Sequence, residues 1–156
     1  MTKSVASPVF VDTNVLVYWQ DTSDPVKQAR AEDWITLLAR HRSARTSAQV
    51  LVELYSTLTR KLPGFGAEKA QRIVRGVAAW RPVPRDLAVI ERAWHLEERY
   101  ALSWWDSLIV AAAQASDCRF LLTEDLQHDQ SFDGVRVINP FRSPDRTPSA
   151  VLEELP

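Results

Sequence analysis

The chain is poor in residues that build several common kinds of site. It has one cysteine, Cys118, which excludes an internal disulfide and a zinc site built on cysteines. It has 4 glycines in no GxGxxG or P-loop arrangement, so we expect no glycine-rich nucleotide site. The longest apolar run, Leu108 to Ala113, is too short to span a bilayer. Met1 to Pro8 lack the apolar stretch of a secretory signal, and these features together predict a cytoplasmic protein.

An excess of positive charge is also lacking. The 19 Lys and Arg residues are balanced by 20 Asp and Glu residues, which gives a net charge of −1. Nucleic-acid-binding domains usually carry a basic excess, so the charge counts against that class. The length of 156 residues suits one domain with a sizeable core.

Short apolar runs alternate with amphipathic segments along the chain. This alternation predicts an α/β fold with a mainly parallel sheet. The expected strands are residues 9–11, 44–47, 119–122 and 135–138, with a very short edge strand at 81–84. The expected helices begin at Thr13 and cover residues 25–40, 48–61, 67–80, 87–100 and 104–116. We predict one domain over residues 1–141 and a loose tail over residues 142–156.

Four acidic residues are expected at one edge of this sheet. Asp12 directly follows the first strand, and Asp125 follows the strand at 119–122. Glu53 lies early in the helix after the second strand, and Asp106 lies in the first turn of the helix that precedes residues 119–122. All four positions fall at the carboxyl ends of the strands, where ligands bind in open α/β sheets.

Each acid also has a purely structural explanation. Asp12 is a favoured residue for capping the helix at Thr13. Glu53 could face solvent, and Asp125 could belong to a turn. Asp106 follows Ser103 at the spacing of a capping box.

Converging carboxylates repel each other unless a cation lies between them. The hard ions Mg²⁺ and Mn²⁺ prefer oxygen ligands and can activate water for attack on a phosphoryl group. The sequence therefore suggests a magnesium or manganese site. Because four carboxylates would strain a metal-free pocket, we expect Asp106→Asn to stabilise the metal-free protein.

Four motifs resemble those of one known family. They are Phe10–Tyr18, Gln49–Leu54, Trp105–Ala113 and Leu121–Asp125. Together they resemble PIN-domain ribonucleases, in particular VapC-type toxins of type II toxin–antitoxin pairs, over roughly Val9 to Phe141.

This resemblance implies a single-domain three-layer α/β/α sandwich and metal-dependent cleavage of RNA that leaves 5′-phosphate and 3′-hydroxyl ends. It also implies inhibition by a small cognate antitoxin, a homodimer and no membrane association. By position, the catalytic, metal-binding acids are Asp12, Glu53, Asp106 and Asp125, and the residues that orient them are Asn14 and Thr123.

The residues around this quartet leave several questions open. Many family members carry Asn where this chain has Glu124. The Glu124 side chain could be a further metal ligand or face solvent, and we expect it to face solvent. His128 is assigned no role, and Asp129 lies close by in sequence. Basic residues that could line the mouth of the site are Arg40, Arg42, Arg45, Arg60 and Lys61.

Two other functions compete with a ribonuclease. A haloacid-dehalogenase-like phosphatase also places an Asp after its first strand, but it needs a second Asp where this chain has Asn14. The other alternative is a PIN-like domain without catalytic activity that binds RNA or has a regulatory role. The complete acidic quartet counts against it.

Overall fold

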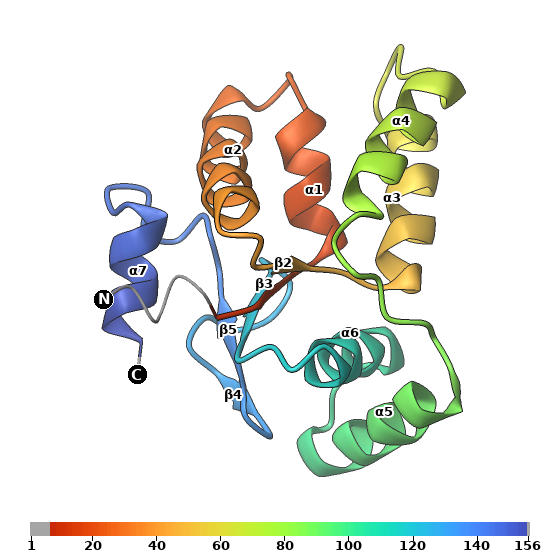
Figure 1. Ribbon diagram of the computed structural model, residues 1–156, viewed down its shortest axis with the longest axis vertical. Helices are drawn as coiled ribbons and strands as arrows, with labels where there is room; N and C mark the ends of the chain where they lie inside the picture. The colour runs from red at the N-terminus through yellow and green to blue at the C-terminus, as the bar shows by residue number, and fades with distance from the viewer. Residues whose placement is uncertain (1–6, 156) are drawn as a thin grey trace.

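The fold is built on a five-stranded sheet, seen in a computed structural model that describes residues 7–155 (Figure 1). The strand order is β2-β1-β3-β5-β4, and all neighbours are parallel except β4, which is antiparallel to β5. The mainly parallel α/β sheet predicted from the sequence is confirmed. The strands are β1 (Val9–Val11), β2 (Ala44–Arg45), β3 (Phe120–Leu122), β4 (Ser131–Phe132) and β5 (Val135–Ile138).

Helices cover both faces of the sheet, which confirms the three-layer arrangement. In Figure 1, α1 to α4 lie on one side of the sheet and α5 and α6 on the other. The helices are α1 (Thr13–Gln20), α2 (Pro25–Arg40), α3 (Ala48–Lys61), α4 (Ala67–Val77), α5 (Leu87–Tyr100), α6 (Trp104–Ala115) and α7 (Pro148–Glu154).

The two central strands bring distant residues to one edge. Every residue of β1 and β3 is buried, as expected for apolar strands covered on both faces. Val11 pairs with Leu122, and the backbone N–H of Asp12 donates to the carbonyl of Leu122 at 3.0 Å. Asp12 and Thr123, which follow these strands, therefore meet at the carboxyl edge.

The predicted helix starts are confirmed by their caps. At α2, α3, α5 and α6 the capping side chain accepts a hydrogen bond from the backbone N–H three residues later, which satisfies a donor that the helix leaves free. The capping residues are Asp24, Ser47, Asp86 and Ser103.

Two expectations about short strands were wrong. Residues 81–84 form no strand of the sheet, and Val83 makes only an isolated parallel bridge to Ser47. The flanking prolines lack the N–H groups that a strand would need. Conversely, β4 lies between the strands expected at 119–122 and 135–138, where no strand was predicted. The turn Asp133–Gly134 connects it to β5 with φ angles of 46° and 91°. An Asp-Gly pair between two strands is a strong hairpin signal that we overlooked.

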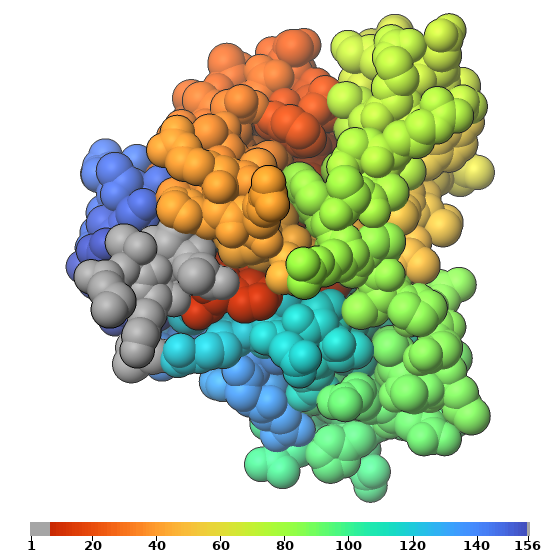
Figure 2. Space-filling view, in the orientation of Figure 1, coloured from red at the N-terminus to blue at the C-terminus, as the bar shows by residue number. Residues whose placement is uncertain are grey.

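The expectation of a loose C-terminal tail was also wrong. Helix α7 lies beside α2 and buries Val151 and Leu152 (Figure 2). Arg30 of α2 is buried and donates hydrogen bonds at 2.6 to 2.8 Å to the main-chain carbonyls of Pro140, Ser143 and Arg146. Apolar burial and these bonds hold the segment on the domain, whereas the division of the chain at residue 141 stays a prediction.

The ends of the chain limit two other predictions. Residues 1–6 and 156 lie outside the described residues, and so do the parts of the domain, tail and signal-peptide predictions that fall on them. None of the helices between residues 7 and 155 has the length and hydrophobicity to cross a bilayer.

Candidate active site at the carboxyl edge of the sheet

Asp12 is the most buried acid of the predicted quartet, with 7% of its surface exposed. It directly follows β1 and has an extended backbone conformation. It caps α1, since its Oδ1 accepts a hydrogen bond from the N–H of Thr13 at 2.7 Å. Its other oxygen, Oδ2, accepts from the hydroxyl of Thr123 at 2.9 Å. Capping and a site role are thus compatible, because one oxygen serves the helix and the other faces the neighbouring strand end.

The environment of Asp12 disfavours its charged form. Burial, and to a smaller extent the carboxylates of Asp125 and Glu53, raise the pKa of this carboxyl from 3.8 to about 7. The hydrogen bonds from Thr123 and Thr13 oppose this rise. At neutral pH, Asp12 is therefore poised to exchange a proton for a bound cation.

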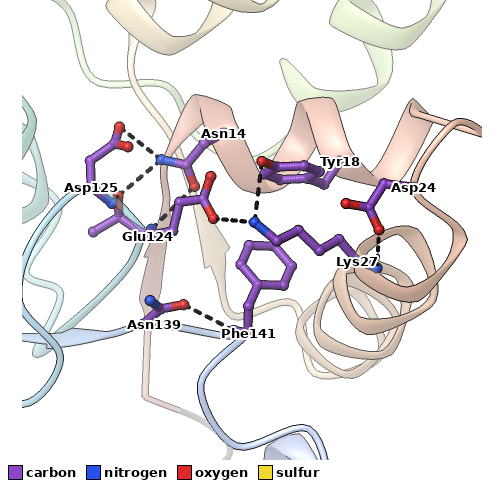
Figure 3. A network of polar contacts seen from close by, with 9 residues as sticks. Asn14, Tyr18, Asp24, Lys27, Glu124, Asp125, Asn139 and Phe141 are labelled. Atoms are coloured by element: carbon purple, nitrogen blue, oxygen red, sulfur yellow. Dashed lines mark hydrogen bonds and ion pairs between the residues drawn. The ribbon is translucent and has the colours of Figure 1, made fainter.

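Asn14 joins Asp12 to Asp125 through its side-chain amide. The Nδ2 group donates to Oδ2 of Asp125 at 3.0 Å (Figure 3). It also donates to the hydroxyl of Thr123 at 3.0 Å and approaches Oδ2 of Asp12 at 3.3 Å. The Thr123 hydroxyl also accepts from the N–H of Asp125 at 3.1 Å. The structure thus places Asn14 and Thr123 between the two acids that they were predicted to orient.

Glu53 is held by two residues that were not predicted to belong to the site. The hydroxyl of Thr13 donates to Oε2 of Glu53, and Nε2 of the buried Gln49 donates to Oε1, each at 2.9 Å. The spacing of four residues between Gln49 and Glu53 on a helix was an available signal. Thr13 gave no signal, because its contact depends on how α1 packs against α3.

Asp106 is at the predicted edge, but among the described residues its carboxylate does not join the hydrogen bonds that link the other three acids. It lies in the first turn of α6, where its backbone N–H donates to Oγ of Ser103 at 3.1 Å. Within residues 7–155, no hydrogen bond or ion pair joins its carboxylate to another side chain, so the structure links only three members of the quartet.

The side chain of Glu124 pairs with a lysine, so the favoured expectation that it faces solvent was wrong. Its Oε2 lies 2.8 Å from Nζ of Lys27, and the Glu124 side chain is 23% exposed. His128 accepts a hydrogen bond at Nδ1 from the N–H of Asn139, and Asp129 pairs with Arg136 at 3.1 Å. The partners of His128 and Asp129 are thus residues outside the acidic quartet.

Some of the basic residues predicted to line the mouth of the site lie elsewhere. Arg40 ends α2 and Arg42 precedes β2, so both lie at the amino edge of the sheet, opposite Asp12. Arg45 donates to the carbonyls of Arg42 and Ala44. Lys61, with its neighbour Arg60, is in the last turn of α3, about 12 Å along the helix from Glu53.

The oxygen atoms of these acids are the kind of ligand that a hard divalent cation prefers. Asp12 and Asp125 present carboxylate oxygens around one amide, and a cation would offset the cost of ionising Asp12 in its buried position. Among the residues that the structure describes, however, no three His, Cys, Asp or Glu side chains form a ready metal cluster. Within residues 7–155, Asp106 also shares no hydrogen-bond partner with the other three acids.

Comparisons with known proteins define the class. The profile of the PIN domain family matches residues 9–131, so the chain belongs to the PIN domain family. This confirms the resemblance seen in the sequence motifs and leaves no support for the haloacid-dehalogenase alternative. A sequence comparison with curated proteins gave no significant match.

Solved structures share the fold at low sequence identity. A chain of a toxin–antitoxin complex from Klebsiella pneumoniae is 21% identical, with a TM-score of 0.62 over 86% of this chain and 98% of that one. A chain of VapBC2 from Rickettsia felis, bound to a promoter DNA fragment, is 18% identical, with a TM-score of 0.59 over 84% and 97%. A chain of FitAcB from Neisseria gonorrhoeae is 21% identical, with a TM-score of 0.57 over 86% and 99%.

Proposed function

We propose that the protein is a Mg²⁺- or Mn²⁺-dependent endoribonuclease and the toxin of a toxin–antitoxin pair. The observation that carries this proposal is Asp12, a buried carboxyl at a strand end, with a pKa of about 7 and a hydrogen-bonded link to Asp125. Membership of the PIN family and a fold shared with chains of toxin–antitoxin complexes support it.

Asp12, Asp125 and Asp106 are the proposed metal ligands, together with Glu53. A bound cation would polarise a phosphoryl oxygen of RNA and activate a water molecule for attack. Asn14 and Thr123 keep the two strand-end carboxylates oriented, and Asp12 would hold the cation in its deprotonated form. The oxygen of water would bond to phosphorus as the bond to the 3′ oxygen breaks, and a proton from that water would pass by way of solvent to the 3′ oxygen, which leaves 5′-phosphate and 3′-hydroxyl ends.

An apolar groove between α2 and α4 is the proposed docking site for a small antitoxin. Its volume is about 520 Å³, and Trp19, Ile35, Ile73 and Trp80 line it, where Figure 2 shows a hollow between the two helices. Val52 and Tyr55 are further exposed apolar residues, on α3. Apolar surface of this kind is typical of protein contacts. We also propose that the toxin is a homodimer and acts on RNA in the cytoplasm.

RNA cleavage by the purified protein tests the proposed activity. We expect cleavage with Mg²⁺ or Mn²⁺, none in excess EDTA, and none by an Asp12→Asn variant prepared in parallel. The variant controls for contaminating nucleases. Cleavage that persists in EDTA would contradict the metal requirement, and a folded parent that leaves RNA intact with either metal would favour the non-catalytic alternative.

The toxin role has its own test. We expect expression of the parent alone to arrest growth, whereas Asp12→Asn should be harmless. If the parent is an active ribonuclease in vitro and yet harmless when expressed alone, the toxin proposal fails and the nuclease proposal stands.

A further inference from the structure

Lys27, in the first turn of α2, lies in a cluster of groups that bind its ammonium. Its Nζ is 2.8 Å from Oε2 of Glu124 and 3.2 Å from the hydroxyl of Tyr18. The same nitrogen lies over two aromatic rings, 4.4 Å from the centre of Tyr18 and 4.9 Å from that of Phe141 (Figure 3). An ion pair and two cation–π contacts thus converge on one nitrogen.

The cluster is ordered more tightly than an ordinary surface ion pair. The side chains of Lys27 and Glu124 are 32% and 23% exposed, so both are partly withdrawn from water. The rings of Tyr18 and Phe141 contact each other edge to face at 5.1 Å. The pKa of Lys27 is raised above its ordinary value, first by the hydrogen bond with Glu124. Partial burial and fixed neighbours make such a pair more effective than an exposed one.

Glu124 connects this cluster to the acidic site through its backbone. Its N–H donates to Oδ1 of Asn14 at 3.3 Å, while Nδ2 of the same Asn14 holds Asp125 and Thr123 at 3.0 Å. One residue therefore contacts Lys27 with its side chain and the site with its main chain. A shift of Glu124 would move the turn that carries Thr123 and Asp125.

We propose that Lys27 is a positioning residue: by binding the Glu124 carboxylate, it fixes the turn at residues 123–125 and keeps Glu124 away from a metal held by Asp12 and Asp125. This role rests on the proposed function for its catalytic consequence, whereas the positioning of the turn does not. It also explains how this chain tolerates an acid beside Asp125, since the extra charge has its own cation.

Amide hydrogen exchange in the metal-free protein tests the positioning by itself. In Lys27→Met we expect faster exchange at the amides of Glu124 and Asp125, which are bonded to Asn14 and Thr123. Lys69→Met is the matched control, because Lys69 lies on α4, 4.5 Å over the ring of Phe65. Unchanged exchange at both amides in Lys27→Met would overturn the proposal, whether or not the protein cleaves RNA.

Kinetics separate positioning from direct binding of RNA by Lys27. We expect Lys27→Met to lower kcat about tenfold with little change in KM, at the low end of the effect of residues that support metal ligands. The charge swap Lys27→Glu with Glu124→Lys should restore most of kcat, since it re-forms the ion pair. A raised KM with unchanged kcat in Lys27→Met, and no recovery in the swap, would mean that Lys27 contacts RNA instead. Absence of RNA cleavage by the parent would remove the proposed function and leave the exchange result intact.

Discussion

Asp12 and Asp106 occupy similar places, each at the start of a helix on the same sheet edge, yet their surroundings differ. Asp12 is buried, accepts hydrogen bonds from the Thr13 N–H and the Thr123 hydroxyl, and has a pKa of about 7. Asp106 is partly exposed, and Ser103 caps its backbone N–H. Burial is the main reason why the Asp12 carboxylate is costly to ionise.

This comparison changes one expectation from the sequence. We expected Asp106→Asn to stabilise the metal-free protein, because we assumed that the four acids share one pocket. The structure assigns the electrostatic cost to Asp12, with contributions from Asp125 and Glu53. Four predictions test this difference between Asp12 and Asp106.

The largest effect is expected for Asp12→Asn. The variant keeps an oxygen that can accept from the Thr13 N–H but loses the buried charge. At pH 8 without metal we expect its free energy of unfolding to exceed that of the parent by on the order of 1 to 3 kcal/mol, with RNA cleavage lost. Urea unfolding of both proteins measures the difference. A variant less stable than the parent at pH 8 would contradict the assignment.

The stability of the metal-free parent should depend on pH through the same carboxyl. The pKa of Asp12 is raised from 3.8 to about 7 on folding, so between these values the folded state binds more protons than the unfolded state. The free energy of unfolding should therefore fall as pH rises through this window, by at most about 1.4 kcal/mol per pH unit.

Unfolding at pH 5.5 and pH 8 tests this, with Asp12→Asn as the control for all other groups. We expect the parent to lose stability relative to the variant on going to pH 8. An equal pH response in the two proteins would show that Asp12 ionises at an ordinary pKa.

A smaller effect is expected for Thr123→Val. The fully buried hydroxyl of Thr123 donates to Asp12 and accepts from Asn14 and from the N–H of Asp125. Its removal should cost about 1 kcal/mol, because it leaves buried polar groups without partners. The pKa of Asp12 should rise further, since the Thr123 hydrogen bond lowers it.

Thr59→Val is the matched control for this prediction. Thr59 donates only to main-chain carbonyls of its own helix, those of Tyr55 and Ser56. We expect a change within about 0.5 kcal/mol. Equal losses of unfolding free energy in the two variants would mean that the Thr123 network contributes nothing beyond a local bond.

The smallest change in stability is expected for Asp106→Asn. Among residues 7–155 its carboxylate has no hydrogen bond or ion pair, so the free energy of unfolding without metal should change by less than about 0.5 kcal/mol. RNA cleavage should still be lost if Asp106 joins the other acids around a metal. An active variant would remove Asp106 from the proposed site.

Much of the fold was predictable from the sequence because local signals agreed with each other. Apolar runs predicted β1 and β3, and the helices expected from residues 48 and 87 begin directly after Ser47 and Asp86, which cap α3 and α5. The C-terminal segment was misjudged because its polar composition hides the two buried residues of α7, Val151 and Leu152, and because Arg30 lies far away in sequence.

The candidate site was predictable to the extent that topology determines it. The ends of β1 and β3 had to bring Asp12 near Thr123 and Asp125, and they do. The pairing of Lys27 with Glu124 spans 97 positions and depends on how α2 packs, so no local pattern indicated it.

Calorimetric titration of Mn²⁺ into the metal-free protein at pH 6.5 tests the central claim most directly. Asp12 should be largely protonated at this pH, so binding should release a proton, and the heat should depend on the ionisation enthalpy of the buffer. We predict such binding for the parent and an affinity at least about tenfold weaker for Asp12→Asn. If Asp12→Asn binds Mn²⁺ as tightly as the parent, and neither releases a proton, Asp12 is not the centre of a metal site.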